Sequence, residues 1–213
     1  MINLNQEWIK PKKPIPIVIF GAGSIANDAH LPAYEKSGFK VLGIYDPDIE
    51  KAQNLATKFN LDIFHSLEEA IDQENVIFDL ATPPEVHTEI LKFLPEKSGV
   101  LIQKPMGSNL DEATKILEIC NTRSLKAAVN FQLRFAPMMI ALKDAINSGL
   151  LGTIVDFDAW LALDTPWSLW KFLENLPRVE ILLHSIHYFD FIRSILGNPI
   201  GVKAKTLGFP GKK

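Results

Sequence analysis

The 213-residue sequence has a single cysteine, Cys120, so no disulfide can form within the chain and a reducing compartment is indicated. It contains no apolar run near the roughly 18 residues that a membrane-spanning helix needs. Its first residues have no apolar core of the secretory type. Positive charge is not in excess either, because the formal net charge is -3. These absences predict a cytoplasmic globular protein whose partners are neither nucleic acid nor membrane.

Strand-like and helix-like segments alternate through the first two thirds of the sequence. The strand-like segments are near-continuous apolar runs, which is typical of parallel strands that are covered on both faces. The segments between them repeat apolar residues at the i, i+3 and i+4 spacing of amphipathic helices. This alternation predicts a doubly wound α/β sheet. The expected strands are residues 15–20, 40–46, 62–64, 76–82, 100–103 and 127–133.

The pattern changes after about residue 135, where the segments no longer alternate regularly. This later part reads as the beginning of a second sheet domain that the sequence does not complete. We therefore expect a nucleotide-binding domain over residues 14–134 and an incomplete second domain over residues 135–213. The expected elements of the second domain are a helix over 136–148, a strand over 152–163, a helix over 184–197 and a strand over 201–209.

The first strand runs directly into a glycine-containing turn that opens a helix. Its spacing fits a dinucleotide-binding loop: Gly21 makes the turn, Gly23 lets a pyrophosphate approach the backbone, and Ala26 lets helix and strand pack closely. The free N–H groups and the dipole of the helix would face the anion. A tight turn without a ligand is the alternative. The residues that we assign to the cofactor loop are Gly21, Ala22, Gly23, Ser24, Ile25 and Ala26.

The second strand ends at Asp46. An acidic residue at this point can accept a hydrogen bond from a ribose 2′-OH and would repel a 2′-phosphate. Asp46 therefore favours NAD over NADP as the cofactor. The alternative is that Asp46, which precedes Pro47, only starts a turn or caps the next helix.

Two further strand ends carry polar residues, at the edge where open α/β sheets bind their ligands. We assign Thr82, Pro83 and His87, which follow the fourth strand, to the cofactor site. Gln103 and Lys104 end the fifth strand and belong to the same site. Desolvation there would lower the pKa of Lys104 and suit it to proton transfer or carbonyl polarisation. A plain strand–helix connection and a solvated lysine are the structural alternatives.

Taken together, these motifs resemble the glucose–fructose oxidoreductase / inositol dehydrogenase (Gfo/Idh/MocA) family of NAD(P)-dependent oxidoreductases. The resemblance covers roughly residues 14–210 and rests on six motifs in the family's order. It implies a Rossmann domain followed by an α/β domain with an open, mostly antiparallel sheet. The motifs are GAGSIA, YD, ATPPEVH, QKP where the family usually has Glu-Lys-Pro, NFQLRFAP and HSIHYFDFIRSILG.

The resemblance also implies hydride transfer between NAD(P) and a secondary alcohol of a sugar, cyclitol or related polyol. By position, Lys104 would lie beside the nicotinamide and the reacting hydroxyl, and His187 would take or return the hydroxyl proton. A base of near-neutral pKa and a nearby cation lower the barrier to such a step. The catalytic candidates are therefore Lys104 and His187.

Three more residues are candidates for substrate contact. The ring of Trp167 can stack on a sugar, Arg134 can reach a cofactor or substrate oxygen, and His184 shares a helical face with His187. The respective alternatives are packing for Trp167, a surface ion pair for Arg134, and capping or packing for His184. We expect no metal, because no cysteine or further histidine lies near the histidine pair.

Two departures from the family pattern bear on function. Leu183 stands where the family often has an acid, and Gln103 replaces the glutamate before the lysine. The family also continues well beyond this length, so we expect either a fragment of a longer protein or a shortened member whose exposed sheet edge a homo-oligomer would cover. A non-catalytic nucleotide-binding regulatory or assembly protein on the same fold is the alternative function. A methyltransferase that uses S-adenosylmethionine is another, but Lys104-Pro105 and the histidine helix argue against it.

Overall fold

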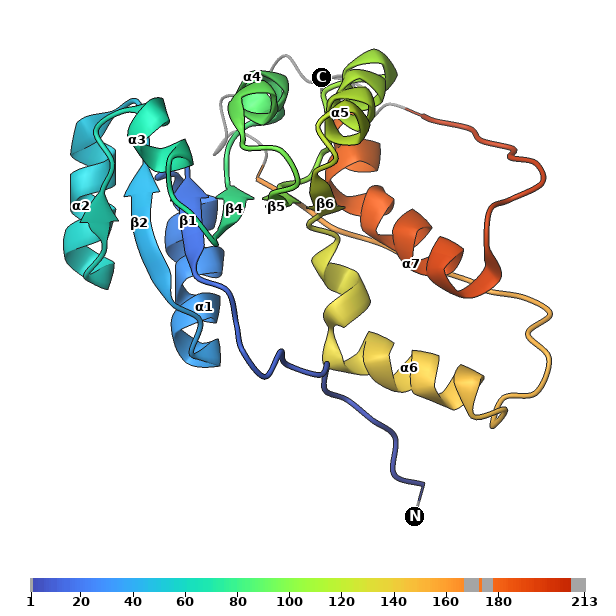
Figure 1. Cartoon of the computed structure of the whole chain (residues 1–213). Coiled ribbons are helices and arrows are strands. Elements are labelled where there is room, and N and C mark those ends of the chain that lie inside the picture. Colours follow the sequence, from blue (N-terminus) through green and yellow to red (C-terminus); the bar gives the residue numbers. More distant parts are fainter. Residues whose placement is uncertain (1, 167–172, 174–177, 208–213) are drawn as a thin grey trace. The chain divides into compact units, whose positions relative to one another are not determined.

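The structure is a computed structural model of the chain, and it describes residues 2–166, 173 and 178–207. The chain forms two compact units (Figure 1). The expected domain limits, 14–134 and 135–213, stay a prediction. We name the units the sheet unit, residues 8–131 and 163–184, and the helical unit, residues 1–7, 132–162 and 185–213.

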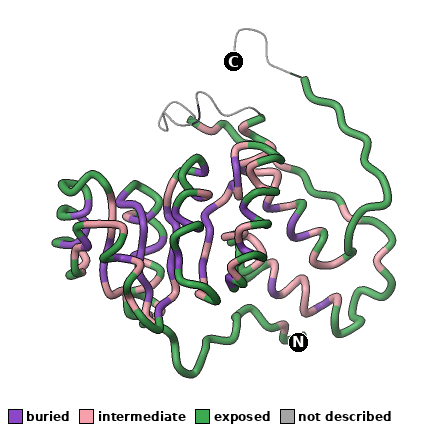
Figure 2. Tube along the Cα trace, turned by 45° about the horizontal axis from the view of Figure 1, so that its top comes forward, coloured by how far each residue is buried: buried purple, intermediate pink, exposed green. Residues whose placement is uncertain are grey.

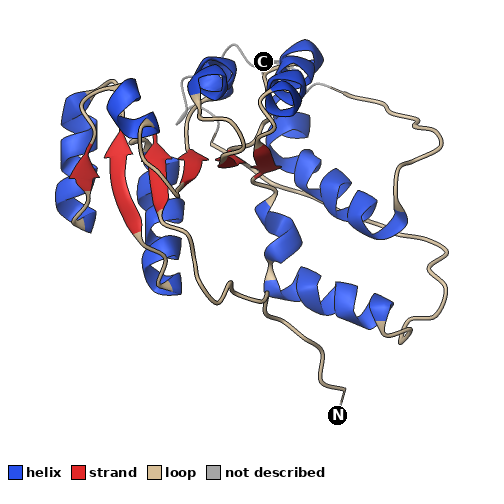
Figure 3. Ribbon diagram, in the orientation of Figure 1, coloured by secondary structure: helices blue, strands red, loops and turns tan. Residues whose placement is uncertain are grey.

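The sheet unit is built on six strands that pair only in parallel, in the order β3-β2-β1-β4-β5-β6 (Figure 3). This is the order of a doubly wound Rossmann sheet, in which ligands bind outside the carboxyl ends of the strands where the order reverses, here at β1 and β4. All six expected strands are confirmed, with shorter bounds. They are β1 (Ile17–Phe20), β2 (Val41–Tyr45), β3 (Asp62–Ile63), β4 (Ile77–Leu80), β5 (Gly99–Ile102) and β6 (Lys126–Val129).

Helices connect these strands, and side-chain caps mark where several of them begin. Ser66 Oγ accepts a hydrogen bond from the Glu69 N–H at 3.1 Å, and Asn109 Oδ1 accepts one from the Glu112 N–H at 3.0 Å. No helix within the described residues is long and apolar enough to cross a bilayer. The helical segments of this unit are the π-helix η1 (Ala26–His30), α1 (Leu31–Ser37), α2 (Ile49–Phe59), α3 (Leu67–Ile71), the 3-10 helix η2 (Pro84–Val86), α4 (His87–Phe93), α5 (Leu110–Thr122) and the π-helix η6 (Ile181–Ser185), whose last residue belongs to the helical unit.

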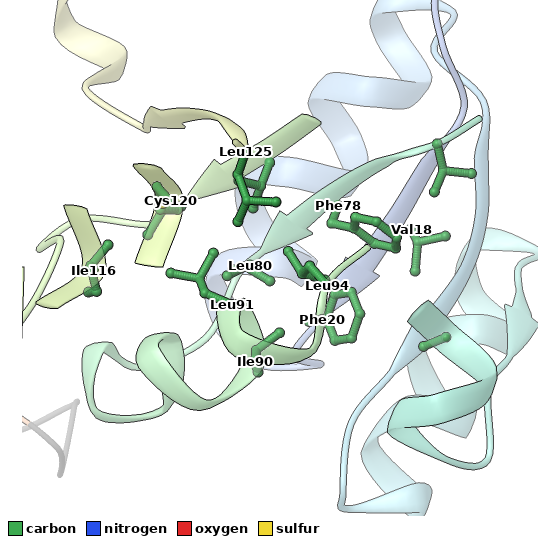
Figure 4. Close-up of a cluster of buried hydrophobic side chains, with 14 of the residues drawn as sticks. Val18, Phe20, Phe78, Leu80, Ile90, Leu91, Leu94, Ile116, Cys120 and Leu125 are labelled. Atoms are coloured by element: carbon green, nitrogen blue, oxygen red, sulfur yellow. The ribbon is translucent and has the colours of Figure 1, made fainter. Parts of the chain in front are cut away.

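The core of the sheet unit lies on both faces of the sheet. Val18 and Phe20 of β1 enter one hydrophobic cluster with α3, α4 and α5, and Ile19 enters another with α1 and α2. The first cluster also contains Phe78 and Leu91, which contribute from β4 and α4 (Figure 4). Buried segments follow the central strands (Figure 2). Cover on both faces explains why the strands read as continuous apolar runs.

The described part of the helical unit contains the two expected helices but not the two expected strands; residues 208 and 209 of the second expected strand lie outside the described residues. Residues 154–163 and 201–207 are irregular and mostly exposed. A strand is stable only beside other strands, and the described part of this unit offers none. The sixth expected strand is also too long, because the chain leaves β6 after Val129 and turns into a 3-10 helix. The helical segments are η3 (Gln132–Phe135), α6 (Pro137–Asn147) and α7 (Ile186–Leu196).

Candidate cofactor-binding site

The loop between β1 and η1 contains the two glycines of the expected motif. Gly21 has a φ of +98°, and a Cβ at this position would lie 2.5 Å from the backbone oxygen of Ala81. Any other residue would therefore push the loop away from the sheet. A Cβ at Gly23, in contrast, would meet no atom within 4 Å among the described residues other than its chain neighbours. The space beside Gly23 is open to a ligand.

The carboxylate of Asp46 lies against this loop. Its Oδ2 accepts a hydrogen bond from the Ala22 N–H at 2.7 Å, and its Oδ1 accepts one from the Asp48 N–H at 2.9 Å. A carboxylate has about four acceptor sites, so both oxygens can still accept a hydrogen bond from a ribose hydroxyl. The cap of α2 is Asp48, whose side chain accepts from the Lys51 N–H. Asp46 thus starts the turn and also faces the loop, so the two interpretations of this residue are compatible.

A pocket of about 520 Å³ opens beside the loop. Its wall contains Gly21, Gly23 and Asp46, together with Thr82 and Pro83 from the carboxyl end of β4. The Oγ1 of Thr82 is buried and has no hydrogen-bond partner among the described residues. An open backbone, a carboxylate and an unused hydroxyl at one pocket fit an adenine dinucleotide. Apolar side chains complete the wall, among them Val86, Ile90 and Phe93.

A second hollow, of about 330 Å³, adjoins the same loop. Its wall is basic, and it was not predicted from the sequence. Ser24, Asn27 and Lys58 line it, and the Lys58 ammonium donates a hydrogen bond to Asn27 Oδ1 at 2.7 Å. Lys51 lines both hollows, with its Nζ 2.9 Å from the carboxylate of Asp48. The seven-residue spacing of the two lysines places them on one face of α2. That signal was available, but exposed lysines on helices are common.

Three other residues assigned to the cofactor support the loop in different ways. Ala26 is fully buried between helix and sheet, while Ile25 is partly exposed. His87 is fully buried, with its Nε2 3.1 Å from the Thr82 carbonyl and its Nδ1 3.4 Å from the Met106 carbonyl. Burial lowers the pKa of His87. A neutral imidazole has one N–H, and the shorter contact indicates that His87 donates it to the backbone of Thr82.

Lys104 follows β5 and is half-buried, and its burial lowers the pKa of the ammonium. Its Nζ donates a hydrogen bond to the Leu183 carbonyl at 3.3 Å. Its backbone N–H donates to the side-chain oxygen of Gln103 at 2.8 Å. The fall in pKa is the one expected for a lysine held at a strand end.

Leu183 stands where the family that the sequence resembles often has an acid, and its surroundings are apolar. Its side chain is buried and packs with Leu173 and Val179. The neighbouring His184 has its Nδ1 2.9 Å from the carboxylate of Glu180. Position 183 therefore carries no acid. The carboxylate that His184 contacts is that of Glu180, four residues earlier in the chain.

The remaining candidates belong to the helical unit or lie outside the described residues. His187 is on α7 and is buried. Arg134 of η3 makes a bidentate ion pair with Asp190, with Nε 2.7 Å from Oδ2 and Nη2 2.6 Å from Oδ1. This pair engages the guanidinium that was a candidate for substrate contact. Trp167 lies outside the described residues.

Comparison with known proteins gives one family. The family model GFO_IDH_MocA, described as "Oxidoreductase family, NAD-binding Rossmann fold", matches residues 15–131, which is more than half of the chain. Trans-1,2-dihydrobenzene-1,2-diol dehydrogenase from Mus musculus is 30% identical over 203 residues, which cover 89% of this chain and 59% of that protein. Glucose-6-phosphate 3-dehydrogenase from Bacillus subtilis (strain 168) is 30% identical over 141 residues, 65% of this chain and 40% of that protein.

A solved structure shows the same fold. The WlbA dehydrogenase from Bordetella pertussis, solved in complex with NADH and UDP-GlcNAcA, superposes with a TM-score of 0.69 at 21% sequence identity. The match covers 87% of this chain and 59% of that chain. The chain thus spans about half the length of the curated relatives that it matches.

Proposed function

This chain belongs to the Gfo/Idh/MocA family of oxidoreductases with an NAD-binding Rossmann fold, and from that premise we propose that it binds NAD in the 520 Å³ pocket. We further propose that it serves hydride transfer between this cofactor and a secondary alcohol of a sugar, cyclitol or related polyol. The name of the Bacillus subtilis relative supports a sugar as the substrate. NAD is preferred to NADP in this proposal because Asp46 would repel a 2′-phosphate.

One observation carries the cofactor proposal, namely the open space at Gly23. A Cβ there would touch no atom of the described residues beyond its chain neighbours, although Gly21, two positions earlier, is packed against the backbone of Ala81. Packing within the protein therefore does not require a glycine at position 23. A phosphate that approaches the backbone at this position would require one.

The reacting residues are proposed from the family resemblance. Bound NAD supplies the hydride acceptor. The ammonium of Lys104, whose pKa is lowered by burial, would stabilise negative charge on the alcohol oxygen. His187 would accept the hydroxyl proton during oxidation and return it during reduction. Thr82 would contact the cofactor, and His87 would hold the Thr82 backbone.

A titration of the purified chain with NADH and with NADPH tests the proposal. Energy transfer from the tryptophans to the nicotinamide would report binding directly. We expect saturable binding with NADH preferred. Gly23→Ala should weaken NADH binding by about tenfold or more, equivalent to about 1.4 kcal/mol, because the added methyl group occupies the space that a phosphate needs.

Gly38→Ala is the matched control. Gly38 ends α1 with a φ of +74°, and a Cβ there also meets no atom within 4 Å. This substitution should alter stability but not NADH affinity. Equal NADH affinity in Gly23→Ala and the unaltered chain would contradict the cofactor proposal.

A non-catalytic nucleotide-binding regulator is the second candidate, and the buried, apolar surroundings of Leu183 favour it. Such a protein would bind NADH but turn over no polyol. Lys104→Ala distinguishes the two functions. It should lower turnover by orders of magnitude if the chain is a dehydrogenase, whereas a regulator has no turnover to lose.

We also propose that the protein associates with itself through the later part of the chain. Val155 and Trp160 are 92% and 94% exposed in a segment with strand-like sequence. Large apolar side chains at this exposure are suited to an interface. Sedimentation should show an oligomer that Trp160→Glu dissociates; a monomeric chain would contradict this assignment.

A further inference from the structure

A cluster of polar side chains lies inside the sheet unit, next to Lys104 in sequence and in hydrogen bonding. At its centre, His30 Nδ1 is 2.7 Å from Asp79 Oδ2, and Tyr34 donates its hydroxyl to the same oxygen at 2.8 Å. On the other side of the ring, His30 Nε2 is 2.9 Å from Gln103 Nε2 and 3.2 Å from Asn130 Nδ2. Asp79 is fully buried, and His30 and Gln103 are nearly so.

The hydrogen bonds in this cluster have one possible direction. The backbone N–H of Lys104 can only donate, so the Gln103 side-chain atom that it contacts is the amide oxygen. The amide nitrogen of Gln103 then faces His30 and donates to Nε2. Since Nε2 of His30 is an acceptor, the ring proton is on Nδ1 and is donated to Asp79. A directed chain of hydrogen bonds therefore runs from the Lys104 backbone to a buried carboxylate.

We propose that His30 is a positioning residue for Lys104: held by Asp79 in its Nδ1–H tautomer, it fixes the Gln103 amide, which in turn holds the Lys104 backbone. The catalytic consequence rests on the proposed function, because it requires Lys104 to act on the substrate. The hydrogen-bond arrangement itself does not depend on that function.

Burial makes this arrangement rigid. Asp79 Oδ1 has no partner among the described residues, so the charge of Asp79 depends on the bonds that its Oδ2 receives from His30 and Tyr34. Burial and the nearby carboxylate both raise the pKa of Tyr34, which keeps its hydroxyl protonated as a donor. A buried charge with few partners is costly. Its presence beside Lys104 is accounted for if it fixes the orientation of His30.

The amide at position 103 is also what lets Nε2 of His30 act as an acceptor. A carboxylate there would accept from the Lys104 N–H and would turn its second oxygen toward His30 Nε2, which would then need to carry a proton as a donor. With Nδ1–H still bonded to Asp79, the ring would hold a proton on each nitrogen between two carboxylates. Gln103 therefore fixes Nε2 as the accepting nitrogen in this chain.

Nuclear magnetic resonance of the full chain tests the arrangement without an activity assay. Long-range proton–nitrogen correlations of His30 distinguish the two neutral tautomers and the imidazolium. We expect a proton on Nδ1 alone in the unaltered chain, and protons on both nitrogens in Gln103→Glu. A proton on Nε2 alone in the unaltered chain would overturn the proposal.

Hydrogen exchange at the Lys104 amide tests the holding of the backbone. His30→Phe and Gln103→Met should each accelerate this exchange by about tenfold or more, and Gln103→Met keeps the test available should His30→Phe not fold. Tyr34→Phe is the control, because it removes a bond to Asp79 but leaves Gln103 and Lys104 paired. Unchanged exchange in Gln103→Met would refute the positioning role.

The same variants separate this proposal from the proposed function. If Lys104 acts on a polyol, Gln103→Met should lower kcat for that polyol. If the unaltered chain binds no NADH, the proposed function fails, while the tautomer and exchange results still decide the role of His30. Equal kcat in Gln103→Met and the unaltered chain would overturn the catalytic consequence.

Discussion

The carboxylate of Asp46 and the backbone N–H of Ala22 are joined by a 2.7 Å hydrogen bond, although 24 residues separate them in the chain. The bond ties the end of β2 to the loop that follows β1. The residue proposed to bind the ribose therefore also shapes the loop proposed to bind the phosphates. A substitution of Asp46 must be interpreted with both roles in mind.

Asp46→Asn and Asp46→Arg should both shift cofactor preference toward NADPH. Asparagine keeps an acceptor for the Ala22 N–H but removes the negative charge that repels a 2′-phosphate. Arginine adds a favourable charge and should have the larger effect, with the ratio of the two dissociation constants changing about tenfold or more, or about 1.4 kcal/mol. Titrations with NADH and NADPH measure the ratio. Asp62→Asn, on exposed β3, is the control, and an unchanged ratio in Asp46→Arg would contradict the ribose assignment.

Gly21→Ala should destabilise the protein, and Gly23→Ala should not. At Gly21 the positive φ costs about 1–2 kcal/mol for a residue with a Cβ, and the clash with the Ala81 oxygen adds to that cost. At Gly23 there is neither a positive φ nor a clash. Urea unfolding of the two variants measures the difference in free energy of unfolding. Similar unfolding midpoints would show that Gly21 is not held as described.

The centre of the sheet was predictable because β1 and β4 are largely apolar and buried. The glycine loop and Asp46 were predictable because their spacing follows directly from a strand, a turn and a helix. The carboxyl end of β6 could not be predicted in this way. Asn130, which follows it, hydrogen-bonds to His30, a partner 100 residues away. No local pattern reports such a contact.

The contacts of Asp79 could not be predicted from the sequence for the same reason. It interrupts an otherwise apolar strand, and its partners His30 and Tyr34 are 49 and 45 residues away. No role was assigned from the sequence to Asp79, His30 or Tyr34. The expected strands at 152–163 and 201–209 show a different limit. Their sequences have strand character, but strand formation depends on neighbouring strands, which the described part of the helical unit lacks.

Lys104→Met should stabilise the folded chain at neutral pH. Burial lowers the pKa of Lys104 below its usual value of 10.5, so the folded state disfavours the charged form. Below the lowered pKa both states are protonated, and the folded state bears the full desolvation cost of the ammonium. Between that pKa and 10.5 the unfolded chain keeps a proton that the folded chain has released, so the stability of the unaltered chain rises with pH.

The advantage of Lys104→Met should therefore be greatest at pH 7 and should shrink as the pH approaches 10.5. The hydrogen bond from Lys104 to Leu183 is lost in this variant and offsets part of the gain. Urea unfolding at several pH values measures the trend. Lys115→Met, at an exposed position of α5, is the control for removing one positive charge. An advantage that grows with pH would show that burial does not dominate at Lys104.

The ion pair between Arg134 and Asp190 should respond unequally to removal of its two partners. The Arg134 side chain is 34% exposed and the Asp190 side chain is 10% exposed. Arg134→Ala leaves a nearly buried carboxylate without its cation and should lower the free energy of unfolding by about 3 kcal/mol. Asp190→Ala leaves a guanidinium that water can reach, and should cost about 1 kcal/mol.

Two further variants sharpen this last test. Arg134→Lys keeps the charge but cannot form the two parallel bonds, so its cost should lie between those of the two alanine variants. Arg193→Ala, on the exposed side of α7, should change stability by a few tenths of a kcal/mol at most, about the effect of an ordinary surface substitution. Urea unfolding ranks the free energies of unfolding of all four variants.

Because His187 lies three residues before Asp190 on α7, a loss of order around Asp190 should also broaden the nuclear magnetic resonance signals of His187 in Arg134→Ala. Equal costs for Arg134→Ala and Asp190→Ala would show that burial of the carboxylate does not govern the strength of this pair.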